Sequence, residues 1–176
     1  MNLPNKLTLL RIILIPIFIV LLMMGYYYIS AVIFIVASAT DALDGHIARK
    51  YNLITNFGKL MDPLADKLLV VSALVCLVQL GDVPGWMVII ILAREFTITA
   101  LRSVAASEGI VIAAGKSGKL KTVFQMVAIT ALLLKNWPFV YINIPFATIM
   151  LWAALIMTIY SGIEYMIKNK SVFSMK

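Results

Sequence analysis

The sequence has few charged residues and almost no cysteine or histidine. Only 13% of its 176 residues are Asp, Glu, Lys or Arg, whereas a soluble domain carries roughly 25%. It contains one cysteine and one histidine, which excludes an internal disulfide and argues against a zinc site built from nitrogen and sulfur ligands. No stretch is polar enough to form a separate soluble domain. The composition therefore argues against soluble, disulfide-rich and zinc-dependent proteins.

Apolar residues make up 62% of the chain. They occur in runs of roughly 20 residues, the length that crosses the hydrocarbon core of a bilayer as a helix. We expect one domain over residues 1–176: an all-α integral membrane protein with six transmembrane helices and a short N-terminal amphipathic segment. Turn sequences such as GDVPG and NWPF separate the runs. The predicted spans lie near residues 8–25, 29–48, 61–80, 86–106, 119–136 and 143–166.

The formal net charge of +7 reflects membrane topology better than nucleic-acid binding, because the basic residues lie between apolar runs and form no stripe on one soluble face. They gather at the chain start, between the second and third runs, between the fourth and fifth, and at the chain end. The opposite side keeps only Lys135. The positive-inside rule then predicts a multi-pass protein of the cell membrane whose termini and site face the cytoplasm.

Half of the eight acidic residues lie within 26 positions, at Asp41, Asp44, Asp62 and Asp66. Spacings of three and four place each pair on one helical face, and two adjacent antiparallel spans can present them to each other. Four carboxylates repel one another unless a cation joins them, and oxygen ligands suit Mg²⁺, Mn²⁺ or Ca²⁺. They suffice for two ions. The alternatives are pairing with nearby basic residues and an ion path in a cation transporter.

The aspartates belong to the longer pattern D-x2-D-G-x2-A-R-x8-G-x3-D-x3-D. Its positions are filled by Asp41, Asp44, Gly45, Ala48, Arg49, Gly58, Asp62 and Asp66. This pattern resembles the signature of the CDP-alcohol phosphotransferase family, whose members are short six-helix membrane proteins. The resemblance implies metal-dependent attack of an alcohol on the phosphorus of a CDP-linked lipid, with release of CMP. It also implies Mg²⁺ or Mn²⁺ as the metal, two ions at the site, and a homodimer.

Residue roles follow from the same resemblance. The implied metal ligands are Asp41, Asp44, Asp62 and Asp66, and Asp66 also accepts the proton of the attacking hydroxyl. The CDP-lipid would be bound by Asp44, Gly45, Ala48, Arg49 and Gly58. Thr8 and Arg11, at the cytoplasmic start of the first run, are expected near the nucleotide, with anchoring to lipid headgroups as the alternative.

The acceptor alcohol must be inferred from residues outside this signature. The segments LPNKLTLLR, REFTITALR and GKSGKLKTVFQ resemble the phosphatidylglycerophosphate synthase branch of the family, which implies CDP-diacylglycerol and sn-glycerol 3-phosphate as substrates. Other acceptors remain open: inositol phosphate, serine or phosphatidylglycerol. Arg94 and Glu95 could form a structural ion pair or bind substrate. The predicted ligands of the acceptor phosphate are Arg102, Lys116, Lys119 and Lys121, since cations suit a phosphate and Arg binds it through two hydrogen bonds.

Overall fold

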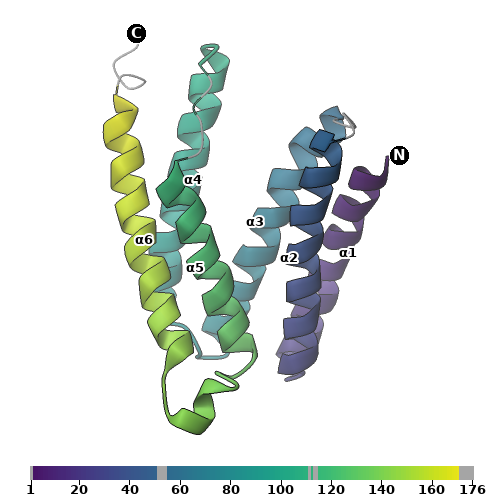
Figure 1. Cartoon of the computed structure of the whole chain (residues 1–176), viewed down its shortest axis with the longest axis vertical. Helices are drawn as coiled ribbons and strands as arrows, with labels where there is room; N and C mark the ends of the chain where they lie inside the picture. Colours follow the sequence, from purple (N-terminus) through teal and green to yellow (C-terminus); the bar gives the residue numbers. More distant parts are fainter. Residues whose placement is uncertain (1, 51–54, 111, 113–114, 171–176) are drawn as a thin grey trace. The chain divides into compact units, whose positions relative to one another are not determined.

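The computed structural model describes residues 2–50, 55–110, 112 and 115–170, with the backbone alone at 3–4, 41–50, 56–57 and 59–60. This part of the chain contains helices and no strand (Figure 1). The helices are α1 (Leu3–Met23), α2 (Tyr27–Lys50), α3 (Asn56–Gln79), α4 (Gly85–Ser107), α5 (Lys116–Leu133), η1 (Phe139–Ile142) and α6 (Phe146–Lys168).

Each predicted span falls largely within one α-helix, which confirms the all-α class. The predicted N-terminal amphipathic segment is not a separate element but the first turns of α1. Pro4 does not interrupt the helix, because proline is compatible with the first helical turn. Among the described residues, two helices are long and apolar enough to cross a membrane: Asn5–Met23 and Phe146–Lys168. A shorter apolar helix runs from Tyr27 to Thr40. The other predicted spans stay predictions.

The chain forms two compact units. The first comprises Met1–Asp82 and Leu133–Lys135, and the second comprises Val83–Leu132 and Asn136–Lys176. The first unit therefore contains α1, α2 and α3, whereas the second contains α4, α5, η1 and α6. The prediction of a single functional domain is not tested by this division.

In the first unit, α1 packs against both α2 and α3. Phe18 of α1 and Phe34 of α2 are buried with ring centroids 6.1 Å apart. Nearer the start of α1 the inward face becomes polar, since Asn5, Thr8 and Arg11 are buried. The apolar Leu9 and Leu10 on the same turns are exposed, an arrangement that suits a helix with an apolar exterior and a polar interior site.

Lys135 connects the ends of elements within the first unit. Its ammonium donates hydrogen bonds to both carboxylate oxygens of Asp82, at 3.1 and 2.9 Å, and lies 3.7 Å from the ring centroid of Tyr27. The predicted outer turn at Asp82 is thereby tied to the start of α2.

In the second unit, α4 packs against α6. Ile98, Leu101 and Tyr165 form a buried cluster between the two helices. The start of α6 is capped from a distance, because the backbone N–H of Ala147 donates to Oδ1 of Asn136 at 2.9 Å. The left-handed φ of +62° at Asn136 is one that asparagine tolerates better than most residues.

Candidate functional site

The first unit contains a polar cluster formed by α1 and α3. Asp62 and Asp66 lie one turn apart on α3, and both are partly buried. The hydroxyl of Thr8, fully buried on α1, donates a 2.5 Å hydrogen bond to Oδ1 of Asp62. The structure therefore joins one residue predicted to lie near the nucleotide to one predicted metal ligand, although they are 54 positions apart in the chain.

Gly58 lies beside this cluster, where the start of α3 meets α1. Thr55 caps α3 by accepting a 3.0 Å hydrogen bond from the backbone N–H of Gly58, and its hydroxyl donates to Oδ1 of Asn5 at 2.9 Å. A Cβ atom at Gly58 would lie 3.3 Å from Asn5 Oδ1 and 3.4 Å from Asp62 Oδ2. These are tight separations, so a side chain at this position would press on the carboxylate. Glycine keeps the space open.

Sequence reasoning missed Asn5 and Thr55. The available signal was the position of Thr55 three residues before Gly58. A threonine N-cap accepts a hydrogen bond from the backbone N–H at this spacing. The partnership of Asn5 with Thr55 joins residues 50 positions apart. No local pattern in the sequence indicates it.

Arg11 occupies the interior of the first unit with no exposed surface. Its Nε donates a 3.2 Å hydrogen bond to the backbone carbonyl of Ala37, four positions before Asp41 on α2. A buried guanidinium requires compensating hydrogen bonds or charges. Arg11 therefore brings a guanidinium into the interior of the first unit, where it bonds the backbone of α2.

The part of the signature on α2 is described only in its backbone. Asp41, Asp44, Gly45, Ala48 and Arg49 are helical, and their side chains lie outside the described ones. Among the side chains that are described, no three His, Cys, Asp or Glu residues gather closely enough to hold a metal ion. Convergence of the four aspartates therefore stays a prediction.

The second unit contains a polar cavity with a volume of about 210 Å³. It is bounded by α4, the start of α5 and the later turns of α6. The lining residues are Arg94, Glu95, Ile98, Arg102, Gly115, Ser117, Gly118, Lys119, Thr122, Ser161 and Tyr165. The predicted phosphate ligands Arg102 and Lys119 are thus brought together, whereas Lys116 is exposed and absent from the wall.

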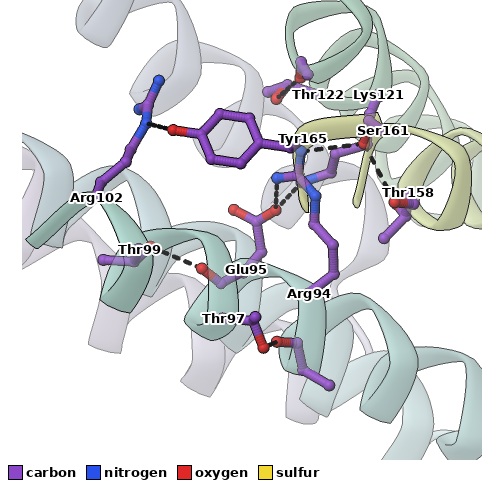
Figure 2. A network of polar contacts seen from close by, with 12 residues as sticks. Arg94, Glu95, Thr97, Thr99, Arg102, Lys121, Thr122, Thr158, Ser161 and Tyr165 are labelled. Atoms are coloured by element: carbon purple, nitrogen blue, oxygen red, sulfur yellow. Dashed lines mark hydrogen bonds and ion pairs between the residues drawn. The ribbon is translucent and has the colours of Figure 1, made fainter. Parts of the chain in front are cut away.

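Glu95 lines this cavity and binds two cationic side chains (Figure 2). Its Oε1 accepts hydrogen bonds from Nη1 of Arg94 at 2.9 Å and from Nζ of Lys121 at 2.5 Å. Nη2 of Arg94 also donates to the hydroxyl of Ser161 at 3.0 Å. Lys121 is buried and does not line the cavity. The structure thus places the ammonium of this predicted phosphate ligand on a carboxylate.

Arg102 is held by Tyr165 of α6. Its Nε donates a 3.0 Å hydrogen bond to the tyrosine hydroxyl, and its guanidinium carbon lies 5.7 Å from the ring centroid (Figure 2). Among the described residues, none accepts a hydrogen bond from the terminal nitrogens of Arg102, a residue that lines the cavity. Sequence reasoning missed Ser161 and Tyr165, although two polar residues four apart on an apolar helix indicate a shared polar face.

Comparison with known proteins gives a consistent result. A model of the CDP-alcohol phosphatidyltransferase family matches residues 1–160. The chain is 50% identical to the CDP-diacylglycerol–glycerol-3-phosphate 3-phosphatidyltransferase of Bacillus subtilis, over 96% of this chain and 95% of that protein. Proteins with the same name from Rickettsia typhi and Haemophilus influenzae are each 41% identical, over 98% and 94% of this chain and 99% and 91% of their own. The chain belongs to the CDP-alcohol phosphatidyltransferase family.

Proposed function

We propose that this protein transfers the phosphatidyl group of CDP-diacylglycerol to sn-glycerol 3-phosphate, forming phosphatidylglycerophosphate and CMP. The observation that carries the proposal is its similarity, over nearly the whole length of both chains, to relatives named for this reaction. The complete aspartate signature and a separate cationic cavity are the two features that such a transfer needs. One binds a nucleotide-linked donor, and the other binds an anionic acceptor.

The donor site is assigned to the first unit. Asp62 and Asp66, with Asp41 and Asp44 on α2, form a donor set of carboxylate oxygens that fits Mg²⁺ or Mn²⁺, and two ions are expected. When bound, these cations would neutralise charge on the pyrophosphate of the donor. Asp62 is oriented by the hydroxyl of Thr8.

The remaining signature residues Gly45, Ala48, Arg49 and Gly58 are assigned to the CDP-lipid. Gly58 leaves room beside Asp62, and Arg11 adds positive charge to the interior of the same unit. Asp66 is assigned as the base that takes the proton of the attacking hydroxyl, because a carboxylate in hydrogen-bond reach of that proton can accept it.

The acceptor site is assigned to the cavity of the second unit. Arg102 and Lys119 bind the phosphate of sn-glycerol 3-phosphate, with Arg102 fixed by Tyr165. Lys121 contributes indirectly, since its ammonium balances the charge of Glu95. Lys116 lies at the start of α5 and adds long-range attraction for the anion.

The protein acts as a multi-pass enzyme of the cell membrane and as a homodimer. The two apolar helices α1 and α6 support membrane insertion. The six spans rest on the apolar runs of the sequence, and the cytoplasmic orientation rests on the distribution of Lys and Arg. Crosslinking in native membranes tests the dimer. A yield of monomer alone would contradict that assembly.

Release of CMP tests the proposed reaction. The purified protein in detergent is given CDP-diacylglycerol together with sn-glycerol 3-phosphate, inositol phosphate, serine or phosphatidylglycerol in separate reactions. We expect the fastest release with sn-glycerol 3-phosphate, with phosphatidylglycerophosphate as the lipid product. Faster release with another acceptor would leave the family assignment intact and refute the acceptor.

A further inference from the structure

Glu95 uses only half of its hydrogen-bonding capacity within the protein. Both of its bonds, from Arg94 and from Lys121, end on Oε1. No described residue donates a hydrogen bond to Oε2. In Figure 2 this second oxygen points away from the two cations, toward the side on which Arg102 and Tyr165 lie. The carboxylate lines the cavity and its side chain is 23% exposed.

A carboxylate is an unexpected wall for a site that binds a phosphate. Its negative charge repels the anion. The neighbouring Arg94 and Lys121 neutralise that charge, so they attract the phosphate less than unpaired cations would. These ion pairs occupy Oε1 and leave Oε2 for a further hydrogen bond. A carboxylate oxygen accepts strong hydrogen bonds from hydroxyl groups, about twice as strong as those between neutral partners.

The cavity is small and polar on the side of Glu95. Its volume of about 210 Å³ is below the roughly 300–1,000 Å³ of pockets for drug-sized ligands, so it suits a compact acceptor. Arg102 and Lys119 line the same cavity as Glu95. A ligand whose phosphate binds these cations has its adjacent carbon atoms within the same small volume as the carboxylate.

Building on the proposed function, we propose that Oε2 of Glu95 accepts a hydrogen bond from the hydroxyl on C2 of the acceptor. This hydroxyl is on the carbon next to the one that bears the phosphate. The bond makes Glu95 a specificity-determining residue, because an acceptor without that hydroxyl leaves a charged oxygen without its partner. The primary hydroxyl on C1 remains available for reaction with the donor.

Removing the C2 hydroxyl from the acceptor tests this assignment. The probe is 1,3-propanediol monophosphate, which keeps the phosphate and the primary hydroxyl of sn-glycerol 3-phosphate. For the unmodified protein we expect kcat/KM to be about ten- to a hundredfold higher with sn-glycerol 3-phosphate, the range that corresponds to a hydrogen bond with a charged group.

Glu95→Gln should reduce this preference to about threefold or less. In the variant the amide oxygen must face Arg94 and Lys121, which only donate, so the amide nitrogen faces the cavity and no charged acceptor remains there. Glu95→Asp keeps the charge but withdraws the carboxylate, so it should also lower the preference. Glu108→Gln, at the exposed end of α4, is the control and should leave the ratio unchanged.

The ratio of two acceptors within one variant does not depend on how much of the protein is folded, so a loss of stability alone cannot change it. Equal losses of kcat/KM for both acceptors in Glu95→Gln would show that Glu95 only holds Arg94 and Lys121, and would overturn the inference. So would a preference below about threefold in the unmodified protein. Failure to use sn-glycerol 3-phosphate at all would instead refute the proposed reaction. If Glu95→Gln does not fold, the unmodified protein and Glu95→Asp decide the question.

Discussion

The two units of the chain carry polar sites of opposite charge. The site proposed for the first unit contains the carboxylates of Asp62 and Asp66 on α3, and we propose that it binds divalent cations. The site proposed for the second unit has Arg102 and Lys119 in its wall, and we propose that it binds the phosphate of the acceptor. The comparison therefore assigns the metal-bound donor to one unit and the anionic acceptor to the other.

Metal removal gives the largest expected effect, because the proposed reaction depends on the cations bound by the carboxylate site. Exhaustive chelation should reduce CMP release to background, and Mg²⁺ or Mn²⁺ should restore it, since mutually repelling carboxylates require a counter-cation. CMP release is measured before and after each addition. Full activity in the chelated protein would show that the reaction does not require a metal ion.

Asp66→Asn should lower kcat by roughly a hundredfold or more, because the amide retains the size of the carboxylate but cannot accept the proton. Binding of CDP-diacylglycerol, measured by direct titration, should persist in part. Asp82→Asn, which changes an aspartate paired with Lys135, is the matched control and should retain normal turnover. Near-normal turnover of Asp66→Asn would reassign Asp66 to a structural role.

Arg102→Ala should raise the KM for sn-glycerol 3-phosphate by about ten- to a hundredfold and affect kcat less, because it removes a charged partner of the phosphate. The KM for CDP-diacylglycerol should change little. Lys168→Ala, at an exposed cation paired with Glu164, serves as the control. A rise of both KM values by the same factor would place Arg102 outside a dedicated acceptor site.

Gly58→Ala tests whether the carboxylate site needs the space beside Asp62. The added methyl group would lie 3.3 Å from Asn5 Oδ1 and 3.4 Å from Asp62 Oδ2. We expect kcat/KM for CDP-diacylglycerol to fall by roughly tenfold, because small displacements of reacting groups reduce rates strongly. The melting temperature is measured alongside. Unchanged kinetics would show that the cluster tolerates the methyl group.

Tyr165→Phe should have the smallest effect. The ring stays against Arg102, but the hydroxyl that accepts from its Nε is lost. The KM for sn-glycerol 3-phosphate should rise by about two- to tenfold, the range for one ordinary hydrogen bond. An effect as large as that of Arg102→Ala would show that the hydroxyl itself binds the acceptor.

Local patterns predicted much of this protein. The apolar runs located the six α-helices of the described residues, and the GDVPG and NWPF segments marked the turns after α3 and α5. These features depend on neighbours a few positions away in the chain, where composition, periodicity and turn-forming residues determine the backbone.

The tertiary structure decided which side chains meet across helices. The sequence alone determined the all-α class and the aspartate signature, but not that Thr8 orients Asp62 or that Lys121 is drawn onto Glu95. It also did not indicate that Tyr165 holds Arg102. Such pairs depend on the rotation and axial position of one helix against another, and packing of whole helix faces sets both.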